Sequence, residues 1–173
     1  MNRVAYVSST YEDLKEHREA VCQVLRKMRY TVIAMEDYVA RDNRMVDQVL
    51  QDVRDCDIYL GIFAWRYGYV PQEGNPEGLS ITELEYREAR GRKPRLVFLI
   101  DTDAPWPRKY MDSVTGENDR GAHIERLRQD LLKEMHSRFS NPEDLAIAAA
   151  AAVHLTAVDA KACWSSFAYL SAA

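Results

Sequence analysis

The chain has 173 residues, of which 47% are hydrophobic and 29% charged, and its formal net charge is −4 at pH 7. This length and composition are those of one globular domain with a sizeable core. The negative charge argues against a general nucleic-acid-binding protein, which usually carries a basic face. No run reaches the roughly 18 apolar residues that span a membrane. We therefore expect neither a nucleic-acid nor a membrane partner.

Three widely spaced cysteines, Cys22, Cys56 and Cys163, form no C-x-x-C pair. Their odd number and spacing favour reduced thiols and a cytoplasmic location. The histidines show no H-E-x-x-H arrangement and no cysteine partner at zinc spacing, so we expect no metal site. The chain also lacks the G-x-G-x-x-G and G-x-x-x-x-G-K-[ST] motifs of dinucleotide-binding folds and P-loops. We therefore expect no resident cofactor.

Strands and helices alternate along the first hundred residues. Strands are predicted at about 3–8, 30–35, 57–64 and 95–100, and helices near 11–28, 45–53 and 81–90. The third strand is apolar on both faces, as a buried parallel strand should be. This alternation predicts an α/β fold with a flavodoxin-like, doubly wound parallel sheet of five strands. We expect the strand order 2-1-3-4-5 and helices on both faces.

The second half of the chain is less regular. The sequence predicts a polar excursion at about 101–121 and a helix at 123–136. It also predicts a short fifth strand at 137–140 and a last helix at 142–154. Asn141 suits the N-cap of the last helix, and Pro142 suits its first position. We assign residues 1–155 to one domain. For the tail at 156–173 two interpretations stand, docking on the domain or leading into a further domain.

Polar and aromatic side chains follow the predicted strands, at the edge where parallel α/β sheets bind ligands. Ser8, Ser9 and Thr10 follow the first strand. The residues that follow the later strands are Glu36, Asp37, Trp65, Arg66, Tyr67, Ser80, Glu83 and Asp101. Aromatic rings stack on bases, and arginine and helix N–H groups bind phosphate. The mixture predicts a cleft for a nucleotide or nucleoside.

These residues also have purely structural interpretations. Ser9-x-x-Glu12 and Ser80-x-x-Glu83 are capping boxes, which can serve only to start a helix. Trp65 and Tyr67 can pack their loop onto the sheet. The two acids after the second strand can be solvated. Both interpretations stay open for each residue.

Four segments, taken in order, resemble a known family. They are residues 4–14 (VAYVSSTYEDL), 55–63 (DCDIYLGIF), 65–68 (WRYG) and 80–86 (SITELEY). They are similar to the TIR-like domain of unknown function found at the front of many STAND-type, NACHT-type or repeat-bearing signalling proteins. The resemblance covers about residues 3–155. It implies a flavodoxin-like sheet and kinship with TIR domains and nucleoside deoxyribosyltransferases.

The resemblance also implies a catalytic residue. In the wider group a glutamate in the helix after the third strand serves N-glycosidic bond cleavage, and Glu83 occupies the matching position. A carboxylate there acts on the ribosyl C1′ as a nucleophile or by stabilising oxocarbenium character, as in glycosidases. TIR enzymes place a Trp-Cys pair just before that glutamate, whereas this chain has Ile81 and Thr82.

Two functional hypotheses follow. The first is a TIR-like signalling or interaction module with a nucleotide-binding cleft, forming the N-terminal domain of a larger protein. Its expected partners are a second copy, or downstream ATPase or repeat domains. The absence of the Trp-Cys pair favours this hypothesis. The alternative is an NAD or nucleoside N-glycosidase that uses Glu83, with NAD or a nucleotide as substrate or ligand.

Overall fold

Five parallel strands form one sheet. The structure is a computed structural model that describes residues 2–37, 45–116 and 119–170, without the side chains of 45 and 158–170. The strands are β1 (Val4–Ser9), β2 (Thr31–Ala34), β3 (Ile58–Phe63), β4 (Arg95–Ile100) and β5 (Ser137–Phe139). They lie in the order β2-β1-β3-β4-β5, and each neighbouring pair is parallel. The predicted flavodoxin-like topology is confirmed.

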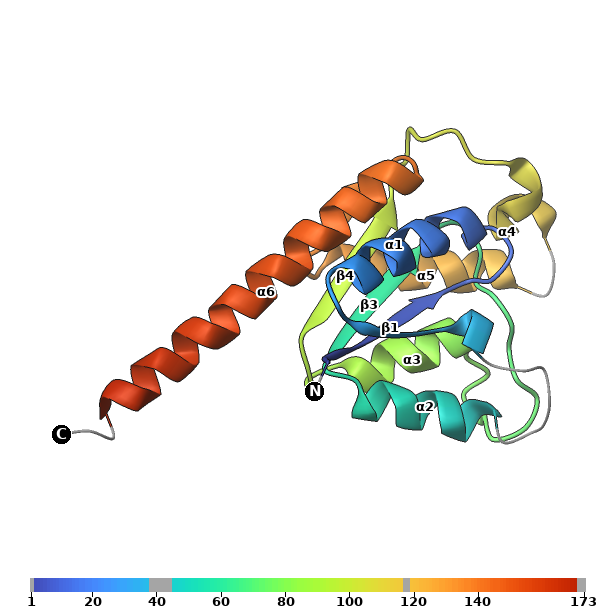
Figure 1. Cartoon of the computed structure of the whole chain (residues 1–173). Coiled ribbons are helices and arrows are strands. Elements are labelled where there is room, and N and C mark those ends of the chain that lie inside the picture. The colour runs from blue at the N-terminus through green and yellow to red at the C-terminus, as the bar shows by residue number, and fades with distance from the viewer. Residues whose placement is uncertain (1, 38–44, 117–118, 171–173) are drawn as a thin grey trace.

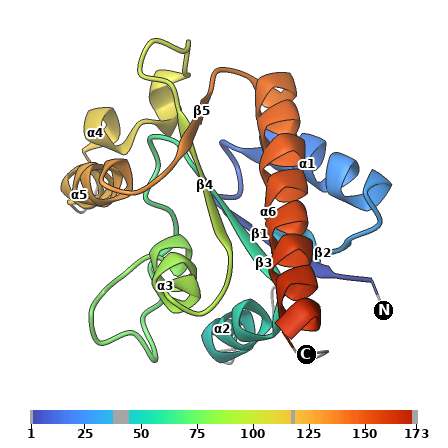
Figure 2. The same cartoon turned by 90° about the vertical axis from the view of Figure 1, so that its left-hand side faces the viewer.

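Helices cover both faces of this sheet (Figures 1 and 2). They are α1 (Lys15–Lys27), α2 (Met45–Asp55), α3 (Ile81–Ala89), α4 (Asp112–Thr115), α5 (Arg120–Leu132) and α6 (Pro142–Leu170). Two short 3-10 turns, η1 (Met35–Asp37) and η2 (Arg108–Tyr110), lie between them. Helices α1 and α6 pack on one face, and α2, α3 and α5 on the other. Within the described residues, none of the helices has the length and apolar character needed to span a membrane.

The central strand β1 contributes to both layers. Its residues Ala5 and Val7 belong to the core formed with α1 and α6. Tyr6 belongs to the opposite core, formed with α2, α3 and α5. Successive side chains of a strand point to opposite faces of the sheet. Consequently Ser8 faces the same layer as Tyr6, and Ser9 faces the layer of α1.

The start of α1 differs from the prediction. The helix begins at Lys15 with Leu14 at its N-cap, and no side chain caps it. Ser9 is the last residue of β1, so the predicted capping box Ser9-x-x-Glu12 is wrong. The hydroxyl oxygen of Ser9 instead accepts a hydrogen bond from Nη1 of Arg18, at 2.8 Å. The Ser9 side chain is thus engaged by Arg18 and does not cap the helix.

The last helix is longer than the sequence analysis predicts. It continues from Pro142 to Leu170, well past the predicted end at His154. Figure 1 shows its C-terminal half projecting away from the sheet. The helix therefore crosses residue 155, which the sequence analysis takes as the end of the domain. Side chains beyond residue 157 lie outside the described part, and with them the predicted docking of the tail.

One buried histidine gives the fold a pH-dependent stability. His17 on α1 lies between the rings of Trp106 and Phe139, with centroids 5.4 and 5.3 Å away. Neither ring nitrogen has a hydrogen-bond partner among the described residues. Burial lowers the pKa of His17, although the nearby carboxylates of Glu16 and Glu143 act in the opposite direction. The imidazole is therefore held in its neutral form in the folded protein.

We expect the wild-type protein to lose stability relative to a His17→Gln variant as the pH falls from 7 to 5. The unfolded histidine takes up a proton near its ordinary pKa of about 6.5, while the folded one takes it up only at lower pH. Protons therefore favour the unfolded state. Urea unfolding at both pH values measures the difference. His154→Gln, on the exposed side of α6, is the matched control, and equal pH dependence in the two variants would contradict this account.

Candidate functional site

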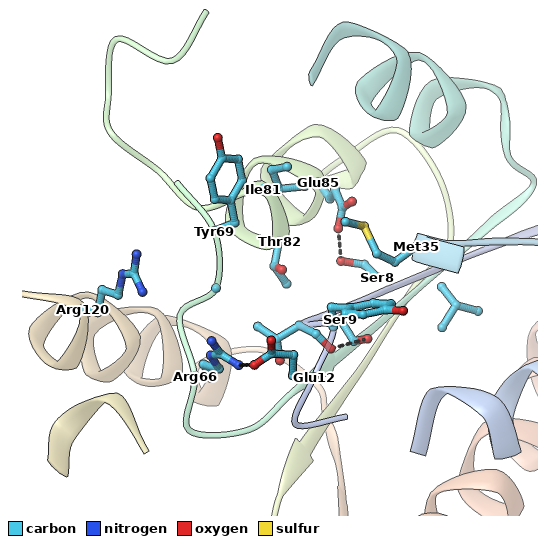
Figure 3. A pocket seen from close by; sticks show the side chains of 14 residues that line it. Ser8, Ser9, Glu12, Met35, Arg66, Tyr69, Ile81, Thr82, Glu85 and Arg120 are labelled. Carbon is cyan, nitrogen blue, oxygen red and sulfur yellow. Dashed lines mark hydrogen bonds and ion pairs between the residues drawn. The ribbon is translucent and has the colours of Figure 1, made fainter. Parts of the chain in front are cut away.

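A cleft of about 240 Å³ opens at the carboxyl ends of β1 and β3 (Figure 3). The chain leaves these neighbouring strands toward opposite faces of the sheet, which makes this the topological switch point. The lining residues come from the end of β1 and the loop after it, from the loop after β3 and from α3, with Met35 from η1 and Arg120 from α5. They are Val7, Ser8, Ser9, Thr10, Tyr11, Glu12, Met35, Arg66, Gly68, Tyr69, Ile81, Thr82, Glu85 and Arg120. This volume suits one nucleoside-sized group better than a whole dinucleotide.

A buried carboxyl group forms one wall of the cleft. Glu85 on α3 is only 4% exposed. The Tyr6 hydroxyl donates to one of its oxygens at 2.7 Å, and the Ser8 hydroxyl donates to the other. Burial raises the pKa of Glu85 to about 7, while the hydrogen bonds from Ser8 and Tyr6 oppose the rise. Near neutral pH, Glu85 therefore populates both its acid and its base form.

The helical repeat explains why α3 presents Glu85 rather than Glu83 to the cleft. Residues Ile81, Glu85 and Ala89 are spaced four apart, so they share the face that packs on the sheet. With 3.6 residues per turn, Glu83 points about 200° away from Glu85. The cleft-lining set includes Glu85 and does not include Glu83.

Glu83 takes part in a separate ionic cluster beside the cleft. Its side chain is 3% exposed and forms ion pairs with Arg87 at 2.6 Å and Arg126 at 3.2 Å. The Tyr67 hydroxyl donates to it at 2.6 Å. The two ion pairs and the hydrogen bond from Tyr67 engage the lone pairs of the carboxylate oxygens. This arrangement is typical of a structural acid.

Four of the residues singled out in the sequence lie together in the cleft. Ser8, Ser9, Thr10 and Arg66 all line it. Arg66 is already paired, since its Nη1 lies 2.5 Å from a carboxylate oxygen of Glu12. Figure 3 shows this ion pair at the rim of the cleft. Because the pair is partly exposed, it contributes little to stability.

The other predicted ligand-binding residues make structural contacts. Trp65 packs against the guanidinium of Arg128, which lies 3.8 Å from its ring centroid. The buried ring of Tyr67 supports Glu83 rather than the cleft. Ser80 caps α3 by accepting from the Glu83 N–H at 3.2 Å, and Asp37 accepts from the Ala34 N–H at 2.8 Å. The contacts match the structural interpretations of these residues.

Arg18 holds the rim of the cleft and was not identified from the sequence. It is fully buried on α1. Its guanidinium donates to the Ser9 hydroxyl and, at 2.9 Å, to the carbonyl of Thr10, and it pairs with Glu36 at 2.6 Å. Its spacing provides the missed signal, because Leu14, Arg18 and Leu25 fall on one apolar face of α1. A charge on such a face needs partners, and these order the loop after β1.

A close contact between loops fixes the shape of the cleft. Gly68 has a φ of +94°, and a Cβ there would lie 3.0 Å from Cγ2 of Thr10. Only glycine fits both conditions without strain.

Among the described residues, no cluster of His, Cys, Asp and Glu could hold a metal ion. The cleft offers hydroxyl groups, the carboxyl groups of Glu12 and Glu85 and the guanidinium groups of Arg66 and Arg120.

The fold and its cleft define an α/β protein of flavodoxin-like topology with a polar site at the switch point. The family model described as a domain of unknown function, DUF4062, matches residues 4–154 of the chain. The chain therefore belongs to this family. None of the curated proteins matches it.

Replacing the buried acid should make the protein more stable at alkaline pH. The folded-state pKa of Glu85 lies near 7, above its ordinary value of 4.5, so ionisation increasingly favours unfolding as the pH rises between these values. Glu85→Gln should therefore exceed the wild type in unfolding free energy at pH 8 by at most roughly 3 kcal/mol, and match it near pH 4. Denaturant unfolding at both pH values measures this.

Glu83→Gln is the matched control on the same helix. It leaves Arg87 and Arg126 without their buried anion and should destabilise the protein at pH 8, by roughly 1–3 kcal/mol. Opposite signs for the two variants are therefore expected. A Glu85→Gln protein that is less stable than the wild type at pH 8 would show that the buried carboxyl is held as a structural anion.

Proposed function

We propose that the chain is a TIR-like signalling module whose cleft binds a nucleoside or nucleotide. The observation that carries this proposal is the cleft at the switch point, with Glu85 and hydroxyl groups in its wall. Ser9, Thr10 and Thr82 present hydroxyls suited to a ribose.

Exposed aromatic rings at the mouth of the cleft support a planar ligand. Tyr11 and Tyr69 both line the cleft, and they are 51% and 60% exposed. Large exposed rings beside a polar pocket are suited to stacking on a base. Their exposure distinguishes them from Trp65 and Tyr67, whose rings are already engaged in packing.

The interaction role of the module has separate support from α6. Ile147 and Leu155 on this helix are 71% and 63% exposed, and the helix extends beyond the sheet (Figure 1). Both residues lie in the half of the helix that precedes the projecting segment, and exposed apolar side chains there favour association with another copy or with a further domain. We include this association in the proposed function, with the cleft as the ligand-responsive part.

Replacing Tyr69 by alanine should weaken nucleoside binding by roughly 5- to 100-fold, the value of one base–aromatic stack. The ring is mostly exposed, so the melting temperature should change little. Isothermal titration calorimetry with a panel of nucleosides and nucleotides measures the affinities. Tyr30→Ala, at the amino end of β2, is the aromatic control and should bind as the wild type does. Binding unaffected by Tyr69→Ala would place the base elsewhere.

A second candidate function is cleavage of an N-glycosidic bond, and the position of Glu85 favours it. A carboxyl group with a pKa of about 7 can act as an acid or a base at neutral pH. In such a reaction the C1′–N bond breaks with its electron pair leaving on the base. Water supplies the hydroxyl to C1′, and its proton goes to the departing base of a nucleoside, or to the solvent when neutral nicotinamide leaves NAD. The ionised Glu85 stabilises positive charge developing at C1′.

If this second function holds, the purified protein should release nicotinamide from NAD or a base from a nucleoside, and Glu85→Gln should reduce the rate by at least 100-fold. Glu83→Gln should retain turnover when assayed below its unfolding temperature. Chromatography of the products measures both rates. The assay is repeated with the protein clustered on a scaffold, because TIR-type enzymes commonly complete their sites on assembly.

The comparison of the two glutamates decides the assignment. Loss of turnover in Glu83→Gln alone would return the catalytic role to Glu83, as the resemblance implies. Absence of turnover in the wild type, clustered or not, together with nucleoside binding, would leave the signalling module as the function.

A further inference from the structure

The second half of α6 extends past the domain on which its first half packs. Val153 is fully buried against the sheet, and the helix continues from there to Leu170. Residues 157–170, which we call the projecting segment, point away from the sheet in Figure 1. At 1.5 Å per residue this segment is about 21 Å long.

The composition of the projecting segment is that of a helix that packs on something. Isolated helices shorter than about 12–15 residues are marginal in water, because most helical stability in proteins comes from packing of an apolar face. Most residues of the segment are apolar, including Trp164, Phe167 and Tyr169, and its charged residues are Asp159 and Lys161. Such a helix is therefore expected to be covered in solution.

A largely apolar groove lies beside the point where α6 leaves the sheet. It has a volume of about 360 Å³, and its lining includes Leu96, Val97 and Phe98 of β4 and Ala152, Leu155 and Thr156 of α6. The register pairs β5 with β4 from Phe98 to Ile100, so the groove lies beside the stretch of β4 that β5 does not reach. Arg95, also in the lining, is paired with Glu134.

Two large apolar side chains of this groove are exposed. Met135 is 95% exposed and Leu155 is 63% exposed, and both line the groove. Apolar side chains that are exposed together beside a hollow are typical of an interaction site. The chain thus carries both an apolar helix that needs cover and an apolar groove that needs an occupant.

A pair of chains satisfies both needs at once. A two-fold axis brings the same surfaces of two copies together. If two projecting segments run antiparallel and cross at residue 163, Leu170 of one copy comes level with Thr156 of the other, because these residues are equally far from 163. Thr156 lines the groove. The end of each helix therefore reaches the groove of the other copy.

The surface available is that of a stable dimer. A buried Trp, Phe or Tyr contributes about 150–250 Å², so the aromatic residues of two projecting segments can supply roughly 900–1,500 Å². The groove and its rim add to this area. Stable protein–protein interfaces bury about 1,200–2,000 Å² in total.

We propose that the chain forms a two-fold dimer in which the projecting segments pack antiparallel and each ends in the groove of the other copy. This inference rests on the association included in the proposed function, and it names the partner and the docking surface. The cleft lies at the carboxyl ends of β1 and β3, whereas the groove lies beside the first half of β4. The dimer therefore leaves the cleft open.

Sedimentation equilibrium of the full chain should show a dimer. Met135→Glu and Leu155→Glu should each raise its dissociation constant by at least roughly 10-fold, because each places an unpaired charge in the interface. Ala162→Pro should do the same by interrupting the projecting helix. Ile147→Glu is the matched control, since Ile147 is 71% exposed on the same helix and is not part of the groove lining. It should leave the dimer intact, and circular dichroism reports the folding of every variant.

The antiparallel arrangement has a test of its own. A spin label is placed at residue 154 by His154→Cys in a Cys163→Ser background, where the remaining thiols, Cys22 and Cys56, are buried. At 1.5 Å per residue on each side of residue 163, the two labels of an antiparallel pair should lie roughly 25–35 Å apart. A parallel pair would bring them within roughly 20 Å. Pulsed electron paramagnetic resonance measures this distance.

Three results would overturn the inference. They are a monomeric wild type, a dimer that Ile147→Glu dissociates while Met135→Glu does not, and the label distance of a parallel pair. None of these results affects nucleoside binding in the cleft, which calorimetry measures separately. A dimer with the expected variants and label distance that binds no nucleoside would uphold the inference and refute the proposed role of the cleft.

Discussion

The position of β1 between β2 and β3 is the constraint on which the site depends. Because side chains alternate along a strand, β1 sends Tyr6 and Ser8 into the α3 layer and Ser9 into the α1 layer. One buried charged residue from each layer contacts the strand. Glu85 of α3 binds Ser8, and Arg18 of α1 binds Ser9. The two contacts, on opposite faces of the same strand, fix the loop that follows it. The cleft exists where these layers diverge.

Buried charges in this protein are held in two different ways. Arg18, Glu83 and Arg128 are each satisfied, Arg18 and Glu83 by opposite charges and Arg128 by the carbonyl groups of Ala64 and Ile100. Such contacts offset the cost of desolvating these groups. Glu85 receives only neutral hydroxyl donors, so burial controls its protonation. An acid left in this state is poorly suited to a structural role and well suited to proton exchange or to recognition of a polar ligand.

The sequence predicted the fold well because the relevant signals are periodic and local. Apolar runs of strand length, separated by helical repeats, led to the strand order, and even the short β5 was expected at 137–140. The site was predicted only in part, because the edge of the sheet follows from topology while the direction of each side chain does not. Ser8 and Arg66 lie in the cleft, whereas Trp65 and Ser80 pack or cap. The apolar stripe of Ile81 and Ala89 did contain a signal for Glu85, since a charge at the intervening position must face the sheet.

Glu83, which stabilises the fold, and Glu85, which faces the cleft, are only two positions apart on α3. On a helix lying against a sheet, neighbours four apart share the buried face, and a residue two positions away points about 200° from them. Arg126 of α5 reaches Glu83 on that side, while no cation reaches Glu85 in the described contacts. A motif that contains both glutamates therefore does not by itself assign their roles. The assignment depends on how α3 is rotated, and the packing of Ile81 and Tyr86 against the sheet sets that rotation.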